Sequence, residues 1–450
     1  MKKDLIKTAK ALEEETNRFY RDVDMARRID KSFSKPDDEP LTDDEKKQID
    51  EYWGKYKFAY PNIDYESFKT FKNRCGKFDV RHCPGAIRTQ YFKKYFNNSH
   101  YIVSFQNKVL TPFLYPDIKQ PDMVVGQANG VLLTSEYKPL TFNEAVDEIP
   151  RYVAEVNPLG VVVKQNMASG GKGVDVITGE NVTRERVTEA LKRLKLNAYV
   201  VQGFLKQSEF MSKFHGGSVN TIRVTTLLHN GRSKVLAALI RAGSGDSLVD
   251  NWCSGGSIIG VDKETGKLNS WALSNDRTRI STLSNGLRLD ENELYIPNYE
   301  RVKEAVISCH YRNPYIKMIS WDVALDENNE PTLIECNFGG MIQIHEATTG
   351  PLFGEYFDEL LDEYLIKRFS ISFAEQNFIC KEFCDHVTIT EYIGDEEDVA
   401  IPETLRDKPV TLLEKNVFKG MNIPSVTVSK AVAERSVSAL SAIKNVIKTE

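Results

Sequence analysis

Three oxygen-bearing side chains near the middle of the chain are spaced so that they could hold a divalent cation. Two apolar runs, MISWDVAL and TLIECN, flank the polar stretch DENNEP, a pattern typical of a β-hairpin. With the turn centred on the Asn-Asn pair, Asp322 lies directly opposite Glu335, and strand alternation puts Asn337 on the same face. The other face carries side chains that can form core: Trp321, Val323, Ile334 and Cys336.

Two carboxylates directly opposed across a strand pair repel each other, so another charge must compensate them. Mg²⁺ prefers oxygen ligands of this type and usually keeps substrate phosphates in its shell. The competing interpretation is a hairpin end with solvated acids. The apolar positions on the other face favour a metal site with Asp322, Glu335 and Asn337 as ligands of Mg²⁺, and Mn²⁺ is the alternative cation.

A glycine loop between two strand-like segments is the second chemical signal. Val161 to Val163 lead to Lys164, and VDVIT follows the loop Ser169-Gly170-Gly171-Lys172-Gly173. Glycines let backbone N–H groups surround an anion. No Ser or Thr follows the Gly-Lys pair and no helix starts there, which excludes a Walker A loop. The pattern favours a flap that closes over a triphosphate, with Lys164 as a point charge; an ordinary hairpin is the alternative.

The elements that must position these groups form an α+β pattern rather than a regular βαβ alternation. Strand-like runs dominate from 160 to 340, with helical spacing in RERVTEALKRL and YERVKEAVISCHY. The first 95 residues are mainly helical in pattern, with Thr42 or Asp43 as the cap of the helix DDEKKQIDEYW. The last 80 residues combine the strand-like HVTIT and VTLLE with a helix predicted from Ser429 to Lys448.

Composition narrows the class of protein. The length of 450 residues predicts two or three packed units, and a formal net charge of -5 argues against binding to nucleic-acid phosphates. The chain has no run of about eighteen apolar residues, so the sequence predicts no membrane-spanning helix. Its N-terminus does not have the pattern of a secretory signal, and we therefore expect a cytoplasmic protein. The seven cysteines show no disulfide framework. Free thiols are the favoured interpretation of two small groups: Cys75 with His82 and Cys83, and Cys380 with Cys384 and His386.

Four motifs, in this order, resemble the ATP-grasp superfamily, and in particular the sugar-transfer-associated ATP-grasp group, which is related to the glutamate-ligase type enzymes. They are VVVKQNMASGGKGV, YVVQGFLKQSEF, GGSVNTIRVTTLL followed by IRAGSGDSLVDNWCSGG, and ISWDVALDENNEPTLIECN. The resemblance implies an α+β fold with two lobes that hold ATP between them. The implied units are a helical N-terminal extension at 1–95, the lobes at 96–199 and 200–368, and a C-terminal extension at 369–450.

The resemblance also implies roles for individual residues. The nucleotide would be held by Lys108, Lys164, the flap of Ser169, Gly170, Gly171, Lys172 and Gly173, and the hinge of Gln202, Gly203, Phe204 and Leu205, whose backbone would read the adenine edge, with Glu209 on the ribose. Asp322, Glu335 and Asn337 match the metal ligands of the family. The γ-phosphate and the acceptor would lie near Arg223, Arg241 and Asn251.

Two departures from the family pattern matter. Gln202 and Gly203 stand where many members carry acids, and Ser320 stands where an arginine often precedes the metal aspartate. The cation for the transition state must then come from Arg223 or Arg241.

The implied activity is an ATP-dependent ligase. It would activate a small-molecule or sugar-linked carboxylate as an acyl phosphate and join it to an amine, as in the modification of cell-surface polysaccharide. A kinase acting on a hydroxyl and a non-catalytic nucleotide-binding subunit are the alternatives. No Ser/His/Asp or Cys/His nucleophile is needed, and the scattered His215, His229 and His345 are interpreted as structural. The oligomeric state is left open.

Overall fold

The computed structural model describes residues 21–22, 24–56, 60, 62–92, 96–97, 99–166, 173–193, 198–245, 252, 255–339, 341–366, 371–383 and 385–450. Five predicted site residues lie outside these ranges: Ser169, Gly170, Gly171, Lys172 and Asn251. Cys384 lies outside them as well. None of the helices in the described ranges is both long enough and apolar enough to cross a membrane.

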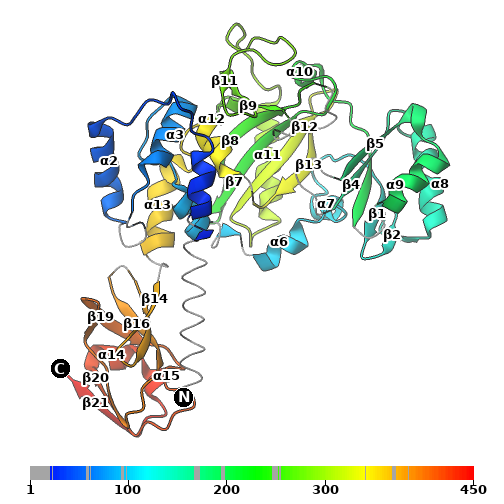
Figure 1. The fold of residues 1–450 in the computed structure, drawn as a ribbon. Helices are drawn as coiled ribbons and strands as arrows, with labels where there is room; N and C mark the ends of the chain where they lie inside the picture. The colour runs from blue at the N-terminus through cyan, green and yellow to red at the C-terminus, as the bar shows by residue number, and fades with distance from the viewer. Residues whose placement is uncertain are drawn as a thin grey trace.

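The first sheet is antiparallel and has the order β3-β2-β1-β6-β4-β5. Its strands are β1 (Met123–Ala128), β2 (Val131–Leu133), β3 (Pro139–Leu140), β4 (Gly160–Gln165), β5 (Val174–Thr178) and β6 (Tyr199–Gly203). Two amphipathic helices, α8 (Phe142–Glu155) and α9 (Arg184–Arg193), cover one face (Figure 1). The strand-loop-strand predicted around the glycine loop is present as β4 and β5, which pair in antiparallel register.

The second sheet is also antiparallel, in the order β11-β10-β9-β8-β7-β12-β13. Its strands are β7 (Thr221–His229), β8 (Arg232–Ala242), β9 (Ser257–Val261), β10 (Leu268–Leu273), β11 (Arg279–Ile280), β12 (Met318–Leu325) and β13 (Pro331–Asn337). The helix α11 (Tyr299–Tyr311) packs on the face that carries Ile222, Ile240 and Trp321. Because side chains alternate along a strand, Arg223, Leu239 and Arg241 lie on the opposite face.

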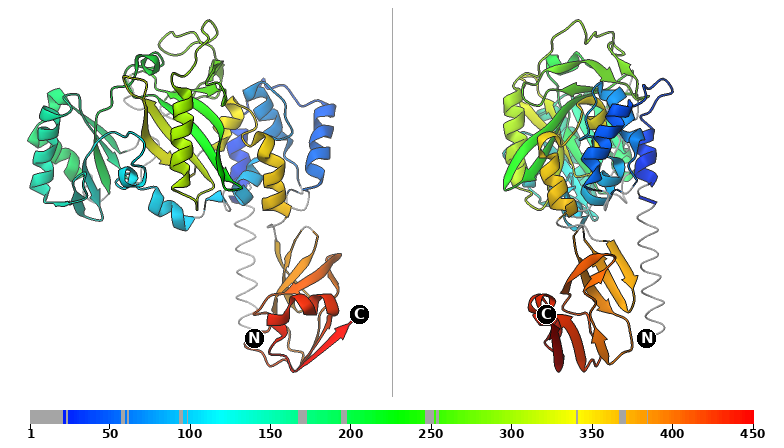
Figure 2. Two further views of the ribbon diagram at one scale, coloured as in Figure 1. Left: turned by 180° about the vertical axis from the view of Figure 1, so that it is seen from behind. Right: turned by 90° about the vertical axis from the view of Figure 1, so that its left-hand side faces the viewer.

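The helix α12 (Ile342–Thr348) packs on that opposite face, since Ile344 and Ala347 share a hydrophobic cluster with Leu239 and Ile258. The N-terminal helices lie against the outer side of α12 (Figures 1 and 2). They are α2 (Asp43–Gly54), α3 (Tyr65–Cys75), α4 (Gly85–Ile87) and the π-helical turn η1 (Arg88–Phe92). The predicted cap of α2 is confirmed: Thr42 accepts a hydrogen bond from the backbone N–H of Glu45.

A second core joins the N-terminal helices to helices from after the second sheet. These are α13 (Phe357–Leu361) and the π-helical turn η5 (Asp362–Ile366), whose aromatic and aliphatic side chains pack with Trp53, Phe68 and Phe92. Short helices α6 (Ser99–Phe105), α7 (Thr111–Leu114) and α10 (Glu209–Ser212) lie between or beside the two sheets (Figure 1). The first lobe and the N-terminal helices thus flank the second sheet from opposite sides (Figure 1).

The C-terminal unit has its own sheets and its own core. Its elements are β14 (Ile371–Glu375), β15 (Phe378–Glu382), β16 (Val387–Tyr392), β17 (Asp398–Ala400), β18 (Thr404–Leu405), β19 (Lys408–Leu413), β20 (Ser425–Ser429), α14 (Lys430–Arg435), α15 (Val437–Leu440) and β21 (Asn445–Thr449). HVTIT and VTLLE are strands as predicted.

The helix predicted from Ser429 to Lys448 is wrong, because the segment forms two short helices and a strand. Between the helices, the Ser436 hydroxyl accepts a hydrogen bond from the backbone N–H of Leu413 at 2.9 Å. Beyond them, β21 pairs in parallel with β20. Tertiary hydrogen bonds therefore override the local helical pattern.

Candidate active site

The candidate metal hairpin consists of β12 and β13. Asp322 pairs directly with Glu335, and Ser320 pairs with Asn337. The Asn337 side-chain N–H donates to Asp322 Oδ2 at 3.1 Å. The register predicted from the sequence is therefore confirmed at the end of the hairpin that carries the polar side chains.

The register shifts by one residue just beyond this polar end, where Val323 pairs with Leu333 and a β-bulge leaves Ile334 without a partner of its own. Leu333 and Cys336 both belong to the core cluster with Trp321 and Val323. Ile334 is only half-buried and lies outside that cluster. The prediction that Ile334 forms core is therefore wrong, since the bulge rotates the strand and Leu333 takes its place.

Asp322 is the centre of a buried cluster of charges. Arg223, which is its partner across β7 and β12, binds the carboxylate in a two-point contact of 2.7 Å from Nε and 2.7 Å from Nη2. Arg241 of β8 donates from Nη1 to Oδ2 at 2.8 Å. Burial alone would raise the pKa of Asp322, but the charges of Arg223 and Arg241 hold it below its ordinary value. The structure thus brings together both predicted arginines and the first predicted metal ligand.

Lys108 links the first lobe to the hairpin. Its Nζ lies 2.9 Å from Glu335 Oε1 and donates to the backbone carbonyl of Asn166 at 3.1 Å. Its own backbone N–H donates to Asn166 Oδ1 at 2.6 Å. Because Asn166 follows β4 directly, Lys108 lies at the strand end that also carries Lys164.

Lys164 lies on the inner face of the first sheet. It pairs with Val200 of β6, which packs with Val109, whereas the neighbouring Val163 belongs to the outer core under α8 and α9. Cross-strand partners share a face, so Lys164 is on the side of the sheet where Lys108 approaches. Gly173, the last residue of the predicted flap, has a φ of 71°, which suits glycine.

The predicted hinge is the end of β6 and the turn after it. Gly203 packs closely against Tyr152, and a Cβ there would clash with the Tyr152 hydroxyl unless that side chain moved. The backbone of Phe204 is already engaged: its N–H donates to the Gly160 carbonyl at 2.9 Å, and its carbonyl accepts from Asn157 at 2.8 Å. Within the described ranges, no hydrogen bond engages the backbone N–H of Leu205.

The remaining nucleotide candidates lie beside this turn. Gln202 is buried on the inner face, paired with Val162. Glu209 is exposed at the first position of α10, after the cap residue Ser208. The backbone N–H of Ser208 donates to the carbonyl of Leu325 at 2.9 Å, so the turn is tied to the far end of β12.

The donor set of the hairpin fits a hard cation that is bound together with phosphates. The described ranges contain no group of three or more His, Cys, Asp or Glu side chains suited to a metal. The hairpin itself contributes two carboxylates and an amide. Mg²⁺ commonly takes one or two carboxylates and completes its shell with substrate phosphate oxygens and water. Asp322, Glu335 and Asn337 would be sufficient for that mode of binding.

One polar chain in this region was missed by the sequence interpretation. His345 of α12 lies with Nε2 3.0 Å from the Thr225 hydroxyl, which is 2.9 Å from the Ser320 hydroxyl. Burial and the nearby charge of Arg223 together lower the pKa of His345 to about 3, so the ring is neutral at pH 7. Nothing local in the sequence marks His345, since its neighbours come from two distant strands.

None of the five cysteines that the structure describes forms a disulfide: Cys75, Cys83, Cys309, Cys336 and Cys380.

A search of solved structures finds similarities at low identity to three proteins: the biotin carboxylase domain of a Hydrogenobacter thermophilus 2-oxoglutarate carboxylase (13% identity, TM-score 0.33), a Vibrio cholerae D-alanyl-alanine synthetase A (14%, 0.33) and a Campylobacter jejuni biotin carboxylase (9%, 0.36). They cover 55%, 58% and 57% of this chain, which in turn spans 46%, 63% and 45% of theirs. A search of curated proteins found no match.

The family model described as sugar-transfer associated ATP-grasp matches residues 86–351, which is more than half of the chain. The matched span contains both sheets, the hairpin, and the residues that gather around Asp322. The predicted α+β ATP-grasp fold is confirmed, and the chain belongs to the sugar-transfer-associated ATP-grasp family.

Proposed function

We propose that this protein is a Mg-ATP-dependent ligase that activates a carboxylate as an acyl phosphate and joins it to an amine. One observation carries the proposal. Arg223 and Arg241 converge on Asp322 at 2.7–2.8 Å, and Lys108 of the other lobe reaches Glu335 at 2.9 Å. Three cationic side chains and two carboxylates, contributed by both lobes, therefore lie at the same end of the hairpin. Such a cluster of charges is suited to phosphoryl transfer, which enzymes promote by positioning and charge neutralisation.

The chain's own residues suggest a division of labour. Lys108 and Lys164, on the inner face of the first sheet, would hold the nucleotide phosphates, and the turn at Leu205 would receive the adenine edge. Mg²⁺, held by Asp322, Glu335 and Asn337, would neutralise charge on the phosphates when bound. The flap at 169–173 would exclude water and so protect the acyl phosphate from hydrolysis.

The two arginines are suited to the reacting end. Arg223 already grips a carboxylate in two-point geometry within the chain, which is the mode in which a guanidinium binds a planar carboxylate or a phosphate. We propose that Arg223 or Arg241 stabilises the charge that develops on the transferred phosphoryl group, because Ser320 stands where family members often have an arginine. Asn251 would contribute on the acceptor side.

The proposed reaction has two steps. An oxygen of the substrate carboxylate attacks the γ-phosphorus, and the bond to the bridging oxygen breaks to release ADP. The amine nitrogen then attacks the carbonyl carbon of the acyl phosphate, phosphate leaves, and the nitrogen loses a proton to give the amide. We propose a small-molecule or sugar-linked acid as the acceptor, a role in modifying cell-surface polysaccharide, and a cytoplasmic location, where ATP is available.

The test is chemical trapping. The protein is incubated with Mg-ATP, hydroxylamine and a panel of sugar acids and amino acids. A ligase yields a hydroxamate together with ADP and free phosphate. A stable phosphate ester without free phosphate would establish the kinase alternative, and ATP binding without ADP formation would establish the non-catalytic subunit. Arg241→Lys is the matched variant, since it keeps the charge but loses the fork, and we expect it to slow hydroxamate formation.

A further inference from the structure

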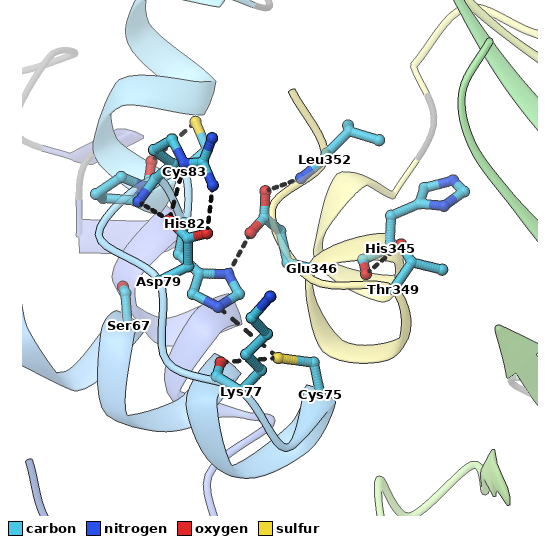
Figure 3. A network of polar contacts seen from close by, with 12 residues as sticks. Ser67, Cys75, Lys77, Asp79, His82, Cys83, His345, Glu346, Thr349 and Leu352 are labelled. Atoms are coloured by element: carbon cyan, nitrogen blue, oxygen red, sulfur yellow. Dashed lines mark hydrogen bonds and ion pairs between the residues drawn. The ribbon is translucent and has the colours of Figure 1, made fainter. Parts of the chain in front are cut away.

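The N-terminal helices are joined to α12 by a buried ion pair, shown in Figure 3. His82 Nδ1 lies 2.6 Å from Glu346 Oε2, and the two side chains are 1% and 0% exposed. The other carboxylate oxygen, Oε1, accepts from the backbone N–H of Leu352 at 3.1 Å. On the far side of the ring, His82 Nε2 lies 3.8 Å from Cys75 Sγ, and the Phe71 ring stacks on the imidazole.

The His82 ring of this pair is protonated at neutral pH. Burial alone would lower the pKa of His82, but its contacts with Cys75 and Glu346 outweigh burial and raise that pKa to about 10. Moving two charges from water into a protein interior is costly, and buried ion pairs often contribute no more to stability than apolar side chains of similar size. The pair is therefore not explained by a gain in stability, and we look for its role in the position that it occupies in the fold.

The ion pair lies on one side of the short helix α12, and another side of the same helix faces the candidate active site. Figure 3 shows the side chains of His345 and Glu346 leaving α12 in different directions. Glu346 turns to the N-terminal helices, whereas His345 contacts Thr225 at 3.0 Å, next to Ser320. Thr225 pairs with Ser320, and two residues further along the same strands Arg223 pairs with Asp322. Residues two apart share a face, so His345 supports the face that carries the charged cluster.

We propose that His82 and Glu346 are positioning residues of the active site. The ion pair fixes α12 on the side that faces the N-terminal helices, and so it sets the position of His345. His345 in turn acts through Thr225 and Ser320 on the geometry of Arg223 and Asp322. The N-terminal helices therefore help to hold the active-site side chains in position. The inference rests on the proposed function, because it assumes that Asp322 serves the nucleotide-bound metal.

The experiment measures how much Mg²⁺ strengthens nucleotide binding. ADP affinity is determined by calorimetry with Mg²⁺ and again with EDTA, and the ratio of the two dissociation constants reports how much the metal adds to nucleotide binding. Glu346→Gln is the main variant, because glutamine keeps the shape of the side chain and an acceptor for the Leu352 N–H but removes the charge. We expect the ratio to fall about tenfold, the scale on which groups behind metal ligands act, while ADP affinity in EDTA is unchanged.

The matched control is Asp30→Asn. Asp30 is a buried acid that packs among the N-terminal helices. It forms an ion pair with Arg88 and accepts a hydrogen bond from the Ser67 hydroxyl at 2.9 Å. Among its hydrogen bonds in the described ranges, none reaches α12. We expect Asp30→Asn to lower the melting temperature and to leave the Mg²⁺ ratio unchanged, because destabilising the segment does not by itself move His345.

A second variant covers the case in which Glu346→Gln does not fold. Thr225→Val keeps the shape of the side chain on β7 and removes the hydroxyl between His345 and Ser320, and we expect the same fall in the ratio. The proposal is overturned if the variant that folds keeps the wild-type ratio, or if Asp30→Asn lowers the ratio as much. If the wild-type protein binds no ADP at all, the proposed function itself fails and this inference falls with it.

Discussion

Asp322 and Glu335 face each other across the hairpin, yet removing their charges would have different consequences. Asp322 is 2% exposed and is the shared partner of Arg223 and Arg241. Its replacement would leave two guanidinium groups without their anion, a change that commonly costs about 3–5 kcal/mol for a buried pair. The side chain of Glu335 is 28% exposed and has Lys108 as its partner. Glu335 is therefore the better residue for testing the metal assignment.

We predict that Glu335→Gln preserves the fold and removes most of the turnover. The midpoint of urea unfolding should change little, because glutamine keeps the shape of the side chain and the ion pair with Lys108 is only partly buried. ADP production with the acceptor found by trapping should fall on the order of 100-fold, as expected when one preorganised electrostatic contact is lost. Near wild-type ADP production in this variant would refute the metal site at Asp322, Glu335 and Asn337. Glu327→Gln, which changes an exposed acid in the turn of the same hairpin, is the control.

At the scale of helices and strands, some features were predictable from the sequence and others were not. The hairpin register was predictable because alternation along two strands and a polar turn leave one pairing that puts apolar residues on one face. The bulge at Ile334 was not, since the extra residue is accommodated by the core that packs against it. The predicted helix from Ser429 fails for a similar reason: Ser436 finds its partner on β19, which local spacing cannot reveal.

One contact at this scale that the sequence does not reveal is the His82–Glu346 pair, whose members are 264 residues apart. Each residue alone is an ordinary His or Glu in a mixed segment. Their meeting depends on the packing of α3 against α12, which in turn depends on both hydrophobic cores of the N-terminal helices. The charged cluster was easier to predict, because its residues lie in motifs of a known family, although its pairing of two arginines with one aspartate was not foreseen.

The turn after β6 carries its own prediction. Because the backbone of Phe204 is used within the chain, the N–H of Leu205 is the donor that we expect to read the adenine edge. Leu205→Pro removes that donor and should weaken ATP binding about tenfold, the loss expected for one hydrogen bond of about 1.4 kcal/mol. Leu205→Ala keeps the donor and should bind ATP as the wild type does. Equal affinities of the two variants in calorimetry would place the adenine elsewhere.

At the scale of the whole molecule, the His82–Glu346 pair makes stability depend on pH. The pKa of His82 is raised from an ordinary 6.5 to about 10 in the folded protein. Below the ordinary value both the folded and the unfolded imidazole are protonated, so the contribution is fully present. Between the two values the unfolded chain loses its proton first, and stability falls by up to about 1.4 kcal/mol per pH unit.

We therefore predict that the free energy of unfolding declines from near neutral pH towards pH 10, and that Glu346→Gln declines less steeply. Urea unfolding of both proteins across this range isolates the contribution of the pair, because groups that titrate elsewhere affect both equally. Parallel curves for the two proteins would show that Glu346 does not raise the pKa of His82.

The C-terminal unit should be dispensable for nucleotide binding. Its core is formed only by side chains from Phe373 onward, whereas the cores that surround the candidate site contain none of them. Figures 1 and 2 show it standing apart from both lobes, and in the described ranges no hydrogen bond joins it to them. A unit with a separate core and few contacts unfolds and folds by itself. We predict that deleting residues 371–450 leaves ADP affinity within about twofold of the full chain, as measured by calorimetry, and removes one of two transitions in urea unfolding. Loss of ADP binding in a truncated chain that still shows the remaining transition would mean that the C-terminal unit contributes to the site.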